Sequence, residues 1–166
     1  MPHFYIDSSA LVKRYHDEDG SRFANELFQY QYGRNEKLYT SSLTAVEFCS
    51  AIMRHKNEGK ITERVAVGIL NIFRIEAESM LFYIDLDRPL IYNSMRLLYE
   101  HSLRSHDSIQ LASGLAVMEH ASKEMGYFYF VCDDERLCQA AEKENLKVLR
   151  PRSAVAHDEL MRLRMA

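Results

Sequence analysis

Short apolar runs alternate along the chain with longer segments in which apolar residues recur every three or four positions. The short runs are rich in β-branched and aromatic residues, a composition that favours strands. They fall at residues 3–6, 38–41, 81–86, 127–132 and 146–149. Because strands that alternate with helices typically build a sheet covered on both faces, the pattern predicts an α/β fold with a mainly parallel sheet.

Four of the intervening segments carry a mostly apolar stripe at helical spacing. The stripes are Val46, Cys49, Ile52 and Met53; Val65, Ile69, Ile72 and Phe73; Leu90, Ser94, Leu97 and Leu98; and Ile109, Leu111, Ala112, Leu115 and Met118. We expect these faces to pack in the core, and we expect the last of the four helices to be more buried than the others.

A length of 166 residues with 47% hydrophobic content fits one domain with a sizeable core. The sequence contains no linker rich in glycine, serine or proline and no internal repeat. We therefore expect one domain over residues 1–151, with residues 152–166 forming a C-terminal helix or tail of the same domain.

The formal net charge of −3 gives no overall basic field, so a polyanion would have to be bound by local Lys and Arg side chains and by metal. Cys49, Cys132 and Cys138 form no CxxC pair, which fits a reducing compartment better than a disulfide framework. The N-terminus lacks the features of a secretory signal, and no apolar run is long enough to span a bilayer. We expect a cytoplasmic protein.

Four acidic residues stand where an apolar run ends and a helix is predicted to begin, namely Asp7, Glu47, Asp107 and Asp134. In an open α/β sheet, strand ends and the following helix starts share one edge, where ligands bind. At roughly 5 Å and an effective dielectric constant near 20, each pair of carboxylates at that edge would cost about 3 kcal/mol. A divalent cation relieves this repulsion, and oxygen ligands favour Mg²⁺ or Mn²⁺. The pattern therefore predicts a metal site.

Each acid also has a purely local interpretation. Thr44 and Glu47 have the T-x-x-E spacing of a capping box. Asp7 and Asp134 could cap the helices that follow them, and Asp107 would interact favourably with the dipole of a first helical turn. Because Ser, Thr and Asn serve as caps equally well, four acids at four such positions favour a shared site.

The segments that carry these acids resemble, in order and spacing, the motifs of PIN domains, and in particular those of VapC-like ribonuclease toxins of type II toxin–antitoxin systems. The matching segments are FYIDSSALVKRY, SSLTAVEFCSAIMR, LRSHDSIQLASG and FVCDDERLCQAAEKENLKVLRP, and together they cover about residues 3–151. The resemblance implies a three-layer α/β/α fold with a central parallel sheet of four or five strands. It also implies a divalent-metal-dependent endoribonuclease, with Asp7, Glu47, Asp107 and Asp134 as the catalytic and metal-binding residues.

One position departs from the family pattern. Thr or Ser usually stands two residues before the fourth acid, where this chain has Cys132, a weaker hydrogen-bonding group. Ser8 keeps the hydroxyl that often follows the first acid. Asp133, next to Asp134, could add a fifth carboxylate.

RNA would be held by polar and cationic side chains near the metal edge. The candidates are Ser8, Lys13, Arg14, Arg54 and Arg104. The simpler interpretation of any one of these cations is a solvated helix face. In the resembled toxins, helices in the region of residues 43–77 form a homodimer and receive an antitoxin protein, so the resemblance implies both partners here.

Two other functions stay open. A PIN fold with impaired catalysis could act as an RNA-binding or protein-interaction module, which Cys132 favours and the four retained acids oppose. A phosphatase with Asp7 as nucleophile would require a second Asp where the chain has Ser9. Zinc chemistry is not indicated, because His101 and His106 lack the spacing of a zinc motif.

Overall fold

Five strands form one sheet in the computed structural model, which describes residues 2–123 and 127–165 apart from the side chains of 122 and 123. They are β1 (Pro2–Ile6), β2 (Leu38–Ser41), β3 (Leu81–Ile84), β4 (Tyr127–Val131) and β5 (Val148–Leu149). All pairs of neighbouring strands are parallel, in the order β3-β2-β1-β4-β5. The predicted strand positions are confirmed, and the sheet is parallel throughout.

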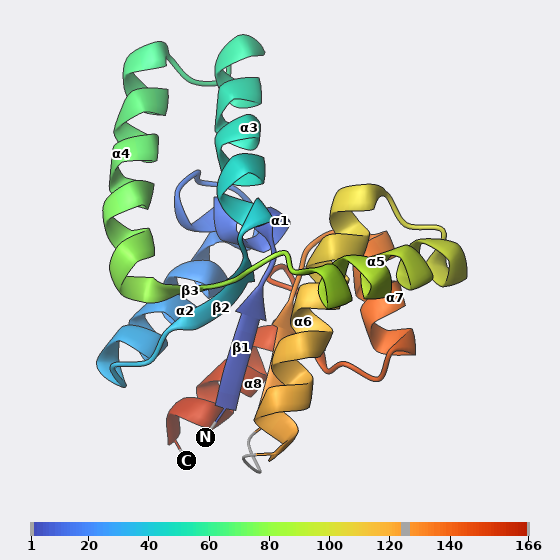
Figure 1. Cartoon of the computed structure of the whole chain (residues 1–166). Helices are drawn as coiled ribbons and strands as arrows, with labels where there is room; N and C mark the ends of the chain where they lie inside the picture. The colour runs from blue at the N-terminus through green and yellow to red at the C-terminus, as the bar shows by residue number, and fades with distance from the viewer. Residues whose placement is uncertain (1, 124–126, 166) are drawn as a thin grey trace.

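Helices follow every strand and cover both faces of the sheet (Figure 1). They are α1 (Ser8–Leu11), the 3-10 turn η1 (Val12–Arg14), α2 (Ser21–Gly33), α3 (Leu43–Asn57), α4 (Glu63–Met80), α5 (Arg88–His101), α6 (Ser105–Lys123), α7 (Glu135–Lys143) and α8 (Ala154–Met165). The predicted three-layer α/β/α fold is therefore confirmed.

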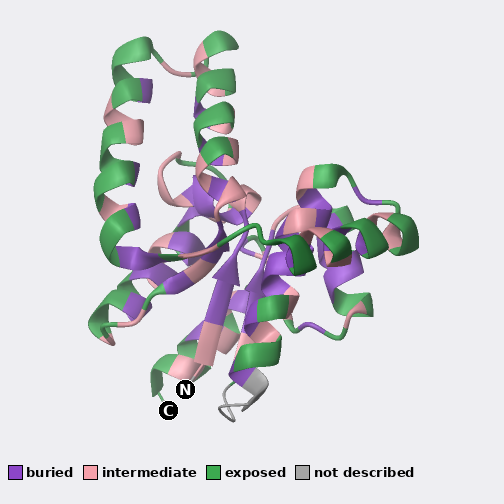
Figure 2. Ribbon diagram, viewed as in Figure 1, coloured by how far each residue is buried: buried purple, intermediate pink, exposed green. Residues whose placement is uncertain are grey.

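The two faces of the sheet have separate cores because successive side chains of a strand point to opposite sides. Phe4 and Ile6 of β1 pack among residues of α2, α3, α4 and α8. Tyr5, between them, packs among residues of α5, α6 and α7. Burial follows this arrangement, and β1 is buried over most of its length in Figure 2.

Helices α3 and α4 lie side by side and extend beyond the carboxyl ends of the strands (Figure 1). Their predicted buried faces are partly wrong, since Val46 is 67% exposed and Ile72 is 54% exposed. The buried stripes are narrower than predicted, and they are formed by Phe48 and Ile52 in α3 and by Ala66, Phe73 and Ala77 in α4. The stripes predicted for α5 and α6 are confirmed at Leu90, Leu97 and Leu111, which are buried.

Helix α8 packs on the same side of the sheet as α2. Ala156 and Leu160 are fully buried in the core cluster that contains Phe4. The Tyr129 hydroxyl of β4 donates to Glu159 Oε1 at 2.6 Å, which fixes α8 to the sheet. Among the described residues, no helix combines the length and the apolar character needed to cross a bilayer.

Candidate active site

All four predicted acids line one cleft at the carboxyl edge of the sheet, with a volume of about 700 Å³. Asp7 directly follows β1, and Asp134 follows β4 after a short connection. Glu47 and Asp107 lie near the starts of α3 and α6. The parallel topology explains this convergence, because every strand of the sheet ends at the same edge.

Asp7 is the most buried of the four acids, with 2% of its surface exposed. Its Oδ1 accepts the Ala10 N–H at 3.1 Å, so it caps α1, and the Ser9 hydroxyl lies 2.9 and 3.0 Å from its two oxygens. Burial removes the carboxylate from water and raises its pKa from 3.8 to about 7. Asp7 is thus a carboxyl group whose ionised form needs a positive charge nearby.

Arg104 holds two of the other acids together. Its Nε donates to Asp107 Oδ2 at 3.0 Å, and its Nη2 donates to Asp134 Oδ2 at 3.2 Å. Asp107 is buried, whereas the Arg104 side chain is 57% exposed and can leave the cleft without disturbing the core. A cationic group therefore already lies between Asp107 and Asp134.

Glu47 is half-buried and accepts a hydrogen bond from the side-chain amide of Gln110 in α6. The capping-box interpretation of Glu47 is wrong, because the cap position of α3 is Ser42 and Glu47 bonds across to another helix. The cap at Asp134 is confirmed by the Leu137 N–H, which donates to its Oδ1 at 3.0 Å. Asp134 thus caps α7 and lines the cleft at the same time.

The five predicted substrate-binding residues separate into two groups. Ser8, Arg54 and Arg104 line the cleft.

Lys13 also borders the cleft, but its side chain is 1% exposed and its Nζ lies 3.3 Å from Glu18 and 3.0 Å from Asp133. Arg14 points elsewhere and is not part of the lining, since it donates to Asn25 at 2.6 Å and to Glu76 at 2.7 Å. Lys13 and Arg14 therefore already have partners within the protein, and neither presents a free charge to a ligand in the cleft.

Asp133, the possible fifth carboxylate, lies between two cations. Its Oδ2 is 3.0 Å from Lys13 Nζ and 2.5 Å from Arg152 Nη2, so its charge is already balanced. Cys132, at the position where the resembled PIN domains have a hydroxyl, is buried in the core cluster of α5, α6 and α7. Burial raises the pKa of its thiol, which donates to the Asp134 carbonyl at 3.4 Å. Cys132 therefore stabilises the connection between β4 and α7 but does not line the cleft.

Two polar residues that hydrogen-bond directly to the acids were missed by sequence reasoning. Ser9, rather than Ser8, carries the hydroxyl that contacts Asp7, and it also accepts the Asp133 N–H at 3.0 Å. Gln110 contacts Glu47. The sequence signal for Gln110 was a single amide inside the apolar stretch Ile109–Ala112, where a polar side chain requires buried partners.

The chemistry of these donors fits a hard divalent cation. Carboxylate oxygens are the ligands that Mg²⁺ and Mn²⁺ prefer, and bound cations lower the pKa of the acids that they contact. Asp7 is buried with a raised pKa, and no ion pair with it is found within the described part of the chain. Asp7, Glu47, Asp107 and Asp134 could hold such an ion, with Arg104 displaced from the two aspartates.

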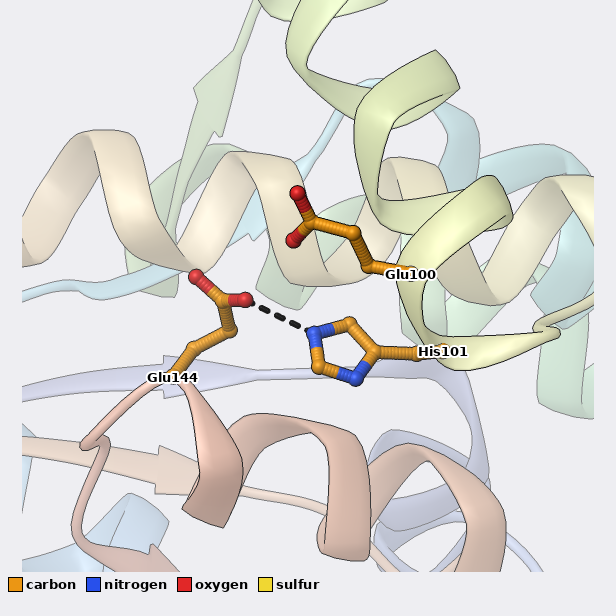
Figure 3. Close-up of side chains that lie close together, drawn as sticks. All are labelled: Glu100, His101 and Glu144. Carbon is orange, nitrogen blue, oxygen red and sulfur yellow. Dashed lines mark hydrogen bonds and ion pairs between the residues drawn. The ribbon is translucent and has the colours of Figure 1, made fainter.

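A second group of possible ligands lies where the C-terminal end of α5 meets the C-terminal end of α7. Among the described residues, Glu100, His101 and Glu144 are the group whose ligand atoms all come within 4.8 Å of one another (Figure 3). His101 Nε2 lies 2.7 Å from Glu144 Oε1, and Arg96 pairs with both glutamates. Because Arg96 and His101 can balance both negative charges, the group is best described as an ion-pair network that joins α5 to α7.

No protein-family model matches the chain, and no curated protein sequence matches it. Among solved structures, the chain is similar to the crystal structure of PAE2754 from Pyrobaculum aerophilum, with a TM-score of 0.61. The two chains are 19% identical, and the match covers 99% of this chain and 96% of that one. At this identity the similarity shows the fold alone, and it extends over the whole three-layer architecture described above.

Proposed function

We propose that the chain is a divalent-metal-dependent endoribonuclease of the PIN type and the toxin of a toxin–antitoxin pair. The observation that carries the proposal is the convergence of Asp7, Glu47, Asp107 and Asp134 on one cleft, although they come from four different segments. The raised pKa of Asp7 adds support, because a carboxyl group buried without a cation costs stability and is typical of functional sites.

We assign a different role to each of the four acids. Asp7 and Asp107, the most buried of the four acids, would be the main metal ligands, and Asp134 would contribute a further ligand directly or through water. Glu47 binds the metal or orients the attacking water. A bound Mg²⁺ or Mn²⁺ would lower the pKa of that water and offset charge on the phosphoryl oxygens. Because water attacks rather than the ribose 2′-hydroxyl, the products are a 5′-phosphate and a 3′-hydroxyl.

RNA would enter along the cationic side chains that line the cleft and remain exposed. Arg54 and Lys60 reach it from the α3–α4 pair. Arg104 has a further role, because a phosphate could receive its guanidinium once a metal ion has taken over Asp107 and Asp134. Binding through these cations would weaken as the salt concentration rises.

The decisive test is cleavage of a mixed RNA pool with Mg²⁺ or Mn²⁺, compared with EDTA. Asp7→Asn should abolish the metal-dependent cleavage while the fold is retained, and Asp158→Asn, the same change at an exposed position of α8, should leave it intact. Undiminished cleavage by Asp7→Asn would refute the assignment of the site.

One observation favours the alternative of a catalytically impaired PIN fold that binds RNA or protein. Arg104 already donates to both Asp107 and Asp134, so two of the four acids have a cationic partner without metal. Calorimetry with Mn²⁺ separates the two functions. Tight metal binding without RNA cleavage would favour the binding module, whereas metal-dependent cleavage would favour the nuclease.

The partners proposed with this function are a second copy of the chain and an antitoxin. Exposed apolar side chains on the α3–α4 pair support a docking surface in that region, among them Val46, Val65, Ile72 and Ile75. The three cysteines are free thiols, which agrees with a cytoplasmic location. Light scattering at micromolar concentration tests dimerisation, and a stable monomer would contradict it.

A further inference from the structure

Gln110 is a buried amide whose hydrogen-bonding groups all have partners. It lies one helical turn after Asp107 on α6 and is 1% exposed. Its Nε2 donates to Glu47 Oε2 and, at 2.9 Å, to Thr44 Oγ1. Its Oε1 accepts the Tyr5 hydroxyl at 2.5 Å. The amide thus joins α6 to α3 and to the central strand.

The direction of these bonds follows from the chemistry of the groups. An ionised glutamate only accepts hydrogen bonds, so the amide must turn its NH₂ group toward Glu47 and its oxygen toward the Tyr5 hydroxyl. Tyr5 is itself fixed, because its buried ring is stacked on Phe130 with centroids 5.1 Å apart. Gln110 therefore has one orientation and little freedom to leave it.

A chain of hydroxyl groups continues from the amide to the backbone beside Asp7. The Thr40 hydroxyl lies 2.7 Å from the Ile6 carbonyl and 2.8 Å from the Thr44 hydroxyl. Since each hydroxyl has one proton, Thr40 donates to the Ile6 carbonyl, Thr44 donates to Thr40, and Thr44 accepts from Gln110. The relay links the side chain of Glu47 to the residue before Asp7.

We propose that Gln110, held by Tyr5, is a positioning residue that fixes the Glu47 carboxylate in the cleft. Glu47 is only half-buried and has three rotatable side-chain bonds, so without Gln110 it would sample several rotamers. The inference rests on the proposed nuclease function for its catalytic meaning. Residues that hold a metal ligand in place commonly change metal affinity or activity 10–100-fold when they are replaced.

Gln110→Met tests the proposal because methionine keeps the length of the side chain and removes the donor. We expect a roughly 10–100-fold loss in Mn²⁺ affinity by calorimetry and in kcat for RNA cleavage, with little change in KM. The matched control is Gln139→Met, which removes an exposed amide that also bonds a glutamate, Glu135, at 2.8 Å. This control should behave as the wild type does.

A second variant separates positioning from folding. Gln110→Met leaves the buried Tyr5 hydroxyl without its acceptor, which lowers stability, whereas Tyr5→Phe combined with Gln110→Met removes both partners. We expect the double variant to recover thermal stability without recovering Mn²⁺ affinity. Recovery of both together would overturn the proposal, because Gln110 would then act only through stability.

A crystal structure of Gln110→Met decides the positioning claim independently of activity. A displaced or multiply oriented Glu47 carboxylate supports it, and a Glu47 carboxylate that stays in its place overturns it. If the wild-type protein cleaves no RNA, the nuclease function fails, yet the position of Glu47 still gives its own answer about Gln110.

Discussion

Replacing Asp7 by Asn should stabilise the metal-free protein, and increasingly so as the pH rises from 5 to 8. The folded-state pKa of Asp7 is raised from 3.8 to about 7 by burial. Between these two values the folded protein keeps a proton that the unfolded chain has released, so wild-type stability falls with increasing pH. Each unit of difference corresponds to about 1.4 kcal/mol, so the interval from pH 5 to pH 7 contributes about 3 kcal/mol.

Urea unfolding in EDTA at pH 5 and pH 8 measures this effect. The quantity to compare is the free energy of unfolding of Asp7→Asn minus that of the wild type. A fixed cost of the asparagine, such as a buried N–H donor without a partner, is the same at both pH values and cancels. We expect the difference to grow by about 3 kcal/mol in favour of the variant, with an unchanged denaturant dependence. Asp158→Asn, an exposed control, should show no such growth.

A difference that stays constant within about 0.5 kcal/mol between the two pH values would refute the reasoning, because surface changes stay within that range. A second measurement compares the stabilisation of the two proteins by metal. With Mn²⁺ at 100 times its Kd, the wild type should gain about 2.7 kcal/mol at pH 8. Asp7→Asn, which lacks a charged ligand, should gain much less.

Two further pairs of variants test the internal packing by urea or thermal unfolding. Lys13→Met removes a buried cation and should lower the free energy of unfolding by about 3 kcal/mol. Lys60→Met removes one partner of an exposed ion pair and should lower it by less than about 1 kcal/mol. Equal losses of stability would contradict the structural role of Lys13. Gly114→Ala would place a Cβ 2.5 Å from the Phe130 ring and should destabilise by about 1–3 kcal/mol. Gly68→Ala lies within α4, where the new Cβ would meet nothing within 4 Å apart from its chain neighbours and its own helix backbone, and it should stabilise by about 1 kcal/mol. A stabilised Gly114 variant would count against the packing of α6 on β4.

The strand order could not be read from the sequence, but the positions of the strands and the convergence of the acids could. Strand and helix periods are local signals, and a parallel sheet sends every strand end to one edge. The predicted faces of α3 and α4 failed at Val46 and Ile72, because periodicity identifies an apolar side but not whether a neighbour covers it. That depends on the tertiary arrangement, in which Val46 lines the open cleft and Ile72 has no neighbouring element among the described residues to cover it.

The supporting residues of the site were beyond sequence reasoning for a different reason. Ser9 meets the backbone of Asp133, and Gln110 meets Glu47, over long distances along the chain. No local pattern encodes such pairs. Lys13 and Arg14 illustrate the same limit, because neighbouring cations with the same local context turn toward different internal acids.

The pairing of β1 with β4 determines when the cleft can form during synthesis. Tyr5 is paired with Phe130, so the central strand obtains one of its two neighbours only after most of the chain has been made. At 5–20 residues per second, roughly 6–25 s separate the addition of Asp7 from that of Asp134. Until then the nascent chain carries some of the acids but has no cleft. Under the proposed nuclease function, the chain would therefore be unable to cleave its own message while the ribosome is still producing it.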